Sequence, residues 1–224
     1  MFEFSDDTEY RRLPIYLLLD TSASMQGVAI EAMNESLHVF AQALRNEPHA
    51  LQTAYISVIT FGGQAEQRLS LVACDEFEPP RLIASGNTPL GQALMLLDAA
   101  IEREVRVHSV EHKGDWKPLV FLFTDGEPTD GNQWRTALAR IKERRDKKVI
   151  NIISIGAPGA NIQLLKEIGG PVLQMNTLTS ESVQDFFGWI TQSTVNASQS
   201  VSQSSSSRQQ LQLPAPPAGI EIVL

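Results

Sequence analysis

Apolar runs alternate with segments of helical periodicity along most of the chain. The continuous apolar runs at residues 15–19 and 119–123 have the pattern of strands that are covered on both faces of a sheet, and the second strand is expected over residues 119–124. Between such runs, apolar residues recur at spacings of three and four, which predicts amphipathic helices. Helices are expected on this basis around residues 29–44, 90–101, 134–141, 162–168 and 183–190.

Four further segments complete the predicted sheet. Residues 54–61 are rich in β-branched and aromatic side chains and end at a glycine pair, so residues 67–72 are expected to return as an antiparallel partner. Residues 149–155 and 172–175 supply the remaining strands. The alternation of strands and helices predicts an α/β fold: a doubly wound, mostly parallel six-stranded sheet with one antiparallel edge strand and helices on both faces.

The composition changes near residue 196. Ser and Gln dominate as far as residue 212 and prolines follow, a composition that cannot bury enough apolar surface to fold by itself. We therefore predict a domain over residues 1–195 and a flexible Ser/Gln/Pro-rich tail over residues 196–224. The tail ends in the short apolar segment 220–224, which would dock on this domain, dock on the sheet edge of a partner, or remain frayed.

Charge and cysteine content narrow the class of protein. The net charge of -8 argues against general nucleic-acid binding, which depends on a basic surface. The single cysteine, Cys74, excludes an intrachain disulfide, and the acidic start of the chain lacks the layout of an export signal, so a cytoplasmic protein is expected. No apolar stretch reaches the ~18 residues that a membrane helix needs, so no membrane association is expected.

A cluster of oxygen-bearing side chains follows the first apolar run. Residues 20–24 have the sequence Asp-Thr-Ser-Ala-Ser, which places a carboxylate and two hydroxyls at alternate positions after a buried strand. Two other segments could complete a site: one contains Thr88, and the other contains Asp125, which also follows a buried strand. In doubly wound sheets, ligands bind outside the carboxyl ends of the strands, and these groups would converge there.

Each of these residues also has an ordinary structural explanation. The three hydroxyls could cap helices, and the two aspartates could be turn residues that bind backbone N–H groups. A chance gathering of all of them at one end of the sheet is the weaker explanation. Oxygen ligands without histidine or thiolate favour Mg²⁺, with Mn²⁺ or Ca²⁺ as alternatives, over zinc. The predicted metal ligands are Asp20, Ser22, Ser24, Thr88 and Asp125.

The spacing of these residues resembles the metal-ion-dependent adhesion site (MIDAS) of von Willebrand factor A (VWA) domains. The pattern is Asp-x-Ser-x-Ser at residues 20–24, then Thr88, then Asp-Gly at residues 125–126, and the resemblance covers roughly residues 14–193. One departure is Ala23, which stands where the family commonly has glycine. Longer stretches resemble TerY-like proteins of the bacterial tellurium-resistance group; they are residues 16–22, 30–34, 57–61 and 86–94.

The resemblance implies a Rossmann-like VWA fold and a non-enzymatic function in metal-dependent protein interaction. It implies hydroxyl ligands from Ser22, Ser24 and Thr88. The carboxylates of Asp20 and Asp125 would bind the metal directly or through water, and an acidic group of a partner would take the remaining position. TerY-like proteins are associated with a protein kinase and a PP2C-type phosphatase, which implies an adaptor role in a phosphorylation system for stress or tellurium resistance.

Two alternatives remain open. A haloacid dehalogenase-like phosphohydrolase also has an aspartate at the end of a central strand, but its mechanism needs a second carboxylate two residues later as general acid and base. Ser22 stands at that position, and a serine cannot shuttle protons near neutral pH, which argues against an enzyme. The other alternative is a metal-independent scaffold that binds partners through its helices or its tail.

Overall fold

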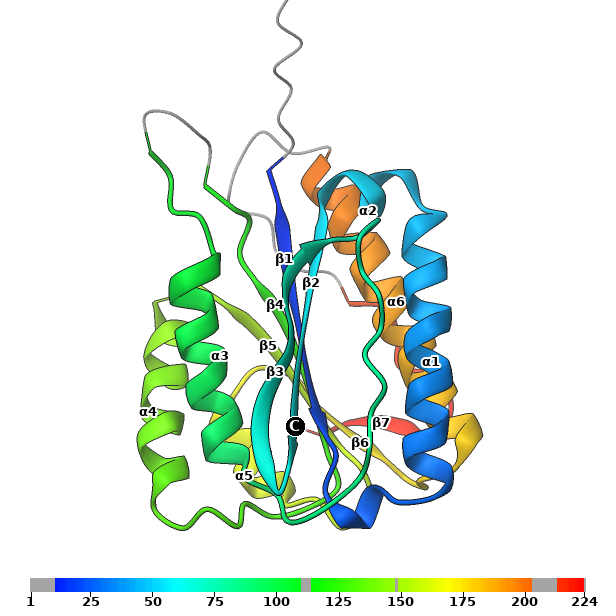
Figure 1. The fold of residues 1–224 in the computed structure, drawn as a ribbon, viewed down its shortest axis with the longest axis vertical. Coiled ribbons are helices and arrows are strands. Elements are labelled where there is room, and N and C mark those ends of the chain that lie inside the picture. Colours follow the sequence, from blue (N-terminus) through cyan, green and yellow to red (C-terminus); the bar gives the residue numbers. More distant parts are fainter. Residues whose placement is uncertain (1–10, 110–113, 148, 203–212, 224) are drawn as a thin grey trace, which may run out of the picture.

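A seven-stranded sheet crosses the middle of the protein (Figure 1). The structure is a computed structural model, and it describes residues 11–109, 114–147, 149–202 and 213–223. The strands are β1 (Leu13–Asp20), β2 (Ala54–Gly62), β3 (Gln64–Ala73), β4 (Leu119–Thr124), β5 (Asn151–Gly156), β6 (Val172–Met175) and β7 (Ile220–Val223). Their order is β3-β2-β1-β4-β5-β6-β7; the inner strands are parallel, and each edge strand is antiparallel to its neighbour.

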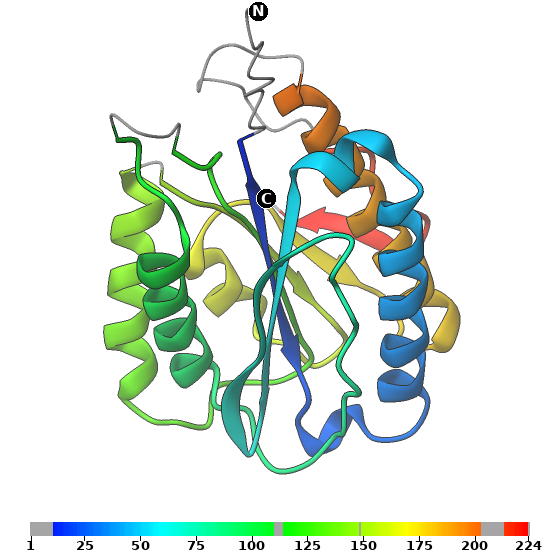
Figure 2. The same cartoon turned by 45° about the horizontal axis from the view of Figure 1, so that its top comes forward.

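Helices cover both faces of the sheet, which confirms the doubly wound α/β prediction (Figure 2). One face carries α1 (Val28–Arg45), α2 (Pro48–Thr53) and α6 (Ser180–Ser202), and the other carries α3 (Leu90–Glu104), α4 (Gln133–Asp146) and α5 (Ile162–Ile168). Ile15 and Leu17 of β1 belong to the core under α1 and α6. The alternate residues Tyr16 and Leu18 belong to the core under α3 and α4, so β1 is buried on both faces. In the described part of the chain, none of the helices combines the length and hydropathy that spanning a bilayer requires.

The sheet contains one strand more than the six expected, and both of its edges are antiparallel. β7 pairs with β6, with Ile222 opposite Leu173, and Ile220 is buried in the core. The apolar end of the chain therefore docks on this domain, which is one of the three outcomes that the sequence left open. The local pattern could not select this outcome, because a strand of 4 residues fits any exposed sheet edge.

α6 extends to Ser202, so the domain boundary expected after residue 195 falls within a helix. Small side chains make this possible: Ser193, Ala197 and Ser198 are buried on a helix that packs closely against α1. The indole N–H of Trp189 then donates a 3.0 Å hydrogen bond to the carbonyl of Pro214, which holds the segment before β7 against α6. The Ser/Gln-rich residues 203–212 lie outside the described residues.

Candidate metal centre

Two neighbouring parallel strands carry the acidic residues of the predicted site to the same edge of the sheet. β1 ends at Asp20 and β4 ends at Thr124, and Leu19 lies opposite Phe123 in the parallel register. Asp20 is therefore level with Thr124, and Asp125 follows one residue later. This edge is the carboxyl end of the inner strands, where ligands of doubly wound sheets bind.

The Asp20 carboxylate is the most deeply buried group of the site, with 0% of the residue exposed. Its Oδ1 accepts a 2.8 Å hydrogen bond from the backbone N–H of Ser22, and its Oδ2 accepts a 2.6 Å hydrogen bond from the hydroxyl of Thr124. Burial raises the pKa of Asp20; the hydrogen bonds from Ser22 and Thr124 oppose this shift, and the Asp125 carboxylate adds to it. A cation beside Asp20 would offset the cost of burying its charge.

The side chains of Ser22, Ser24 and Asp125 form a continuous set of polar contacts. Ser22 Oγ lies 3.0 Å from Ser24 Oγ, and Ser24 Oγ donates a 2.9 Å hydrogen bond to Asp125 Oδ1. Ser22 and Asp125 are buried, whereas Ser24, which joins them, is exposed, so solvent reaches the set at Ser24. Oxygen atoms from two segments of the chain are thus close enough together to face one small cation.

Thr88 reaches the same place from a third segment. A Cβ atom added to Gly126 would lie 3.1 Å from Thr88 Oγ1, so the hydroxyl lies directly beside the loop that bears Asp125. The Thr88 carbonyl accepts hydrogen bonds from the N–H groups of Leu90 and Thr129, each 2.9 Å long. These bonds fix the backbone of Thr88, while its hydroxyl makes no hydrogen bond within the described part of the chain.

The helix-capping role that these hydroxyls could have had is not realised. The N-cap residue of α1 is Gly27 and that of α3 is Pro89, and neither forms a side-chain capping hydrogen bond. A short 3-10 turn, η1 (Ala23–Met25), begins after Ser22, whose side chain does not cap it. Helix capping therefore does not explain why these hydroxyls gather at the carboxyl end of the sheet.

Ala23 fits the loop despite its Cβ. It opens the 3-10 turn η1, whose right-handed backbone has negative φ angles, so this position does not require glycine. The Ala23 N–H donates a 2.8 Å hydrogen bond to the carbonyl of Gly86, which connects the loop to the segment that bears Thr88. The departure from the family pattern at this position therefore leaves the loop unstrained.

Thr124 belongs to the site but was not assigned from the sequence. Its hydroxyl donates to Asp20 Oδ2 and accepts a 3.3 Å hydrogen bond from the N–H of Gly126. It therefore orients the Asp20 carboxylate and connects it to the loop after β4. The sequence feature that could have identified Thr124 is its position at the end of a buried strand, one residue before Asp125.

The assembled donor set fits a hard divalent cation. Side chains from three segments supply carboxylate and hydroxyl oxygens, the ligands that Mg²⁺, Mn²⁺ and Ca²⁺ prefer. Within the described residues, no three His, Cys, Asp or Glu side chains gather as metal ligands, so a site here depends on its hydroxyls. A bound cation would supply a positive centre that can attract an anionic oxygen from a partner.

The chain matches the model of one known protein family. The family described as von Willebrand factor type A domain matches residues 15–189, which is most of the chain. The chain belongs to this family. The search of curated proteins found no match to this chain.

Solved structures share the VWA fold at low sequence identity. A von Willebrand factor type A protein from Catenulispora acidiphila has 16% identity and a TM-score of 0.64, over 83% of this chain and 43% of that chain. The pilus adhesin SpaC from Lactobacillus rhamnosus GG has 15% identity and a TM-score of 0.67, over 84% of this chain and 31% of the adhesin. Proximal thread matrix protein 1 of the mussel byssus, with a zinc-occupied MIDAS motif, has 19% identity and a TM-score of 0.54, over 81% of this chain and 45% of that chain. This chain therefore spans less than half the length of each of these proteins.

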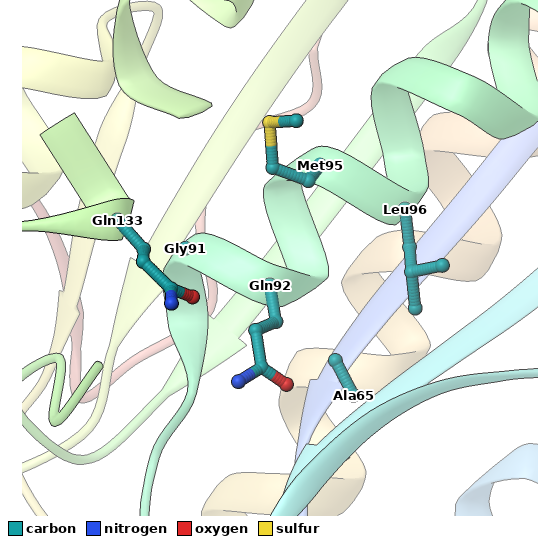
Figure 3. Close-up of a pocket in the computed structure, with 6 residues that line it drawn as sticks. All are labelled: Ala65, Gly91, Gln92, Met95, Leu96 and Gln133. Atoms are coloured by element: carbon teal, nitrogen blue, oxygen red, sulfur yellow. The ribbon is translucent and has the colours of Figure 1, made fainter. Parts of the chain in front are cut away.

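One pocket of the VWA domain opens between β3, the first turns of α3 and the start of α4 (Figure 3). Its volume is about 360 Å³; Gln92 and Gln133 supply amide groups, and Met95 and Leu96 supply apolar surface. The backbone N–H of Gln92 donates a 2.9 Å hydrogen bond to Asp130 Oδ2, which fixes the start of α3 against the loop after β4. The pocket is therefore bounded by the helix that follows Thr88 and by the helix that follows the Asp125 loop.

Proposed function

We propose that this VWA domain is a non-enzymatic adaptor that binds an acidic group of a protein partner through a divalent cation. The observation that carries the proposal is the convergence of oxygen-bearing side chains from three separate segments on one place. VWA domains are a family of interaction modules in which a MIDAS binds the metal. The ligands of this proposal are Asp20, Ser22, Ser24, Thr88 and Asp125.

Mg²⁺ is the cation that the proposal favours, with Mn²⁺ or Ca²⁺ as alternatives. Three of the proposed ligands are neutral hydroxyls, so a bound Mg²⁺ retains much of its positive charge and holds waters that a ligand can replace. A carboxylate from the partner would replace one such water and bridge the two proteins. A protein of similar fold carries zinc in its MIDAS, so zinc is the competitor that binding experiments should include.

The proposal extends to a TerY-like subgroup and to its partners. Residues 16–22, 30–34, 57–61 and 86–94 resemble TerY-like proteins, which are associated with a protein kinase and a PP2C-type phosphatase. We therefore propose an adaptor role in the phosphorylation system of a stress or tellurium response. A cytoplasmic location is part of this proposal, and the one cysteine, which is buried and free, is compatible with it.

Catalysis is not part of the proposal. A haloacid dehalogenase-like mechanism would need a carboxylate two residues after Asp20 to transfer protons. Ser22 occupies that position, and its hydroxyl contacts Ser24 rather than a group that could act as a general base. The site is therefore better suited to holding a cation than to proton transfer.

Metal binding is tested first by titration calorimetry with Mg²⁺, Mn²⁺ and Zn²⁺. Wild type is expected to bind Mg²⁺ or Mn²⁺, and Thr88→Ala is expected to bind more weakly because it loses a hydroxyl ligand. Thr129→Ala is the matched control, because Thr129 is exposed and its hydrogen bond to the Thr88 carbonyl comes from its backbone N–H, which the substitution keeps. Equal affinities for wild type and both variants would contradict the proposed ligand set.

The partner is sought by affinity capture from the native lysate, with Mg²⁺ or with EDTA, followed by mass spectrometry. A protein retained only with Mg²⁺, and lost with Asp20→Ala, is the expected result. A partner that is retained equally with EDTA would assign binding to the helices or the tail and would favour the metal-independent scaffold.

A further inference from the structure

A second pocket lies on the opposite face of β3 from the pocket of Figure 3, between β3 and residues 81–85. Its volume is about 290 Å³, and its lining includes Thr21, Arg68, Arg81 and Ser85. We call it the arginine pocket. It adjoins the candidate metal centre because Thr21 stands in the chain between two proposed ligands, and the Thr21 carbonyl accepts a 2.8 Å hydrogen bond from the N–H of Ser85.

One wall of the arginine pocket is a row of alternate side chains on β3. Gln64, Glu66 and Arg68 are exposed, and all three line the pocket. Arg68 Nη1 lies 3.1 Å from Glu66 Oε2, and the two side chains are 42% and 63% exposed. Such an exposed ion pair is weak, so Arg68 can exchange this partner for another carboxylate.

The other wall is a short segment that α1 holds in place. The Leu82 N–H donates a 2.7 Å hydrogen bond to Asn34 Oδ1, and Asn34 Nδ2 donates a 3.0 Å hydrogen bond to the Leu82 carbonyl. Leu82 is buried, whereas its neighbours Arg81 and Ile83 are exposed. The guanidinium of Arg81 is therefore presented from a fixed backbone, which lowers the entropy cost of binding a ligand.

The charge of the arginine pocket is opposite to that of the whole chain. Two arginines and Glu66 give its lining a net charge of about +1, in a protein whose net charge is -8. Within the described residues, Arg81 forms no ion pair or hydrogen bond through its side chain. A guanidinium has a planar set of donors that matches a carboxylate, so the pocket suits an acidic side chain.

We propose that the arginine pocket binds a second acidic side chain of the same partner segment whose first acidic side chain bridges the metal. This inference rests on the proposed function, because it takes the metal bridge as the first point of attachment. Two attachments a few residues apart fix the direction of the partner segment and select against segments with a single acidic residue. The expected recognition element is therefore a pair of acidic residues at a fixed spacing.

Synthetic peptides are titrated into the ¹⁵N-labelled chain of residues 1–224, and NMR follows the signals of the backbone amides and of the arginine Nε–Hε groups. One peptide carries a single glutamate, and a series of equal length carries two glutamates separated by one, three or five glycines. Each is titrated with Mg²⁺ and with EDTA. The variants are Arg81→Gln and, as a control with the same change in charge, Arg140→Gln on α4, where Asp98 still has Arg144 as a partner.

The expected result is that one two-glutamate peptide binds more tightly than the single-glutamate peptide, and that Arg81→Gln removes this advantage. A loss of about two- to fivefold is expected for an exposed ion pair, with no comparable loss in Arg140→Gln. The Arg81→Glu variant should bind a peptide that has lysine in place of the second glutamate more tightly than it binds the two-glutamate peptide. This result would show that the affinity lost in Arg81 variants comes from the change in charge and not from misfolding.

Other outcomes separate the two proposals. Mg²⁺-dependent binding with equal affinities for the one- and two-glutamate peptides would overturn the arginine pocket and leave the metal bridge intact. Binding that is the same with EDTA would overturn the metal bridge, whatever Arg81 contributes. No shift with any peptide, even at millimolar concentration, would overturn both.

Discussion

Ser24 Oγ donates a 2.9 Å hydrogen bond to Asp125 Oδ1, although 101 positions separate the two residues in the chain. The bond joins the loop after β1 to the loop after β4. It forms because these two strands are parallel neighbours, so their carboxyl ends lie at the same edge of the sheet. The order of the strands in the sheet therefore brings the proposed metal ligands together. The contribution of each side chain can be tested by substituting it separately.

Thr124→Val is expected to weaken Mg²⁺ binding by about 10- to 100-fold, as is typical when a group that orients a metal ligand is removed. The reason is that Asp20 Oδ2 would lose its 2.6 Å hydrogen bond and its fixed orientation. Calorimetry provides the measurement. Ser154→Ala is the control, since Ser154 is also a buried strand residue but its hydroxyl has no hydrogen-bond partner among the described residues. An unchanged Mg²⁺ affinity in Thr124→Val would contradict the orienting role.

Mg²⁺ is expected to raise the melting temperature of wild type but not that of Asp20→Asn. A ligand that binds only the folded state at about 100 times its Kd stabilises that state by about 2.7 kcal/mol. Each kcal/mol corresponds to about 2–4 °C for a domain of this size, so a rise of roughly 5–10 °C is expected. Differential scanning fluorimetry with Mg²⁺ and EDTA measures it. An equal rise in both proteins would place the metal elsewhere.

Ile220→Ala is expected to destabilise the protein by about 2–4 kcal/mol, because it removes a buried side chain from the core. Ile220 is 4% exposed, whereas Ile222 on the same strand is 54% exposed. Ile222→Ala is therefore a matched control and should cost well under about 1 kcal/mol. Urea unfolding followed by circular dichroism gives both values. Similar losses in the two variants would show that the docking of β7 does not depend on burying Ile220.

Cys74 is expected to resist thiol reagents in the folded protein. The residue is fully buried, and burial raises the pKa of its thiol to about 11. At pH 8 only about one thousandth of such a thiol is present as the reactive thiolate, and the reagent must also reach it. Reaction with a chromogenic disulfide should be slow at pH 8 and rapid once urea unfolds the chain. Rapid reaction of the folded protein would show that the strand end beside Cys74 opens readily.

The elements that depend on local pattern could be predicted closely. β4 and α5 have the bounds expected from their apolar spacing, because each is an element with a clearly apolar buried side. The segments that carry the candidate ligands were also recognisable, since alternating polar oxygens directly after an apolar strand are unusual in a buried environment. The ligand assignment itself remains a prediction that the metal titrations test.

What the sequence determined by itself is the type of each element, through the period of its apolar residues, and the chemistry at the strand ends. Tertiary structure alone decided which edges and surfaces meet. β7 joined the sheet because β6 presented an unpaired edge, and the polar second half of α6 became helical because small side chains allow close packing on α1. The role of Thr124 and the position of Arg81 likewise come from contacts between distant segments, which a local pattern does not encode.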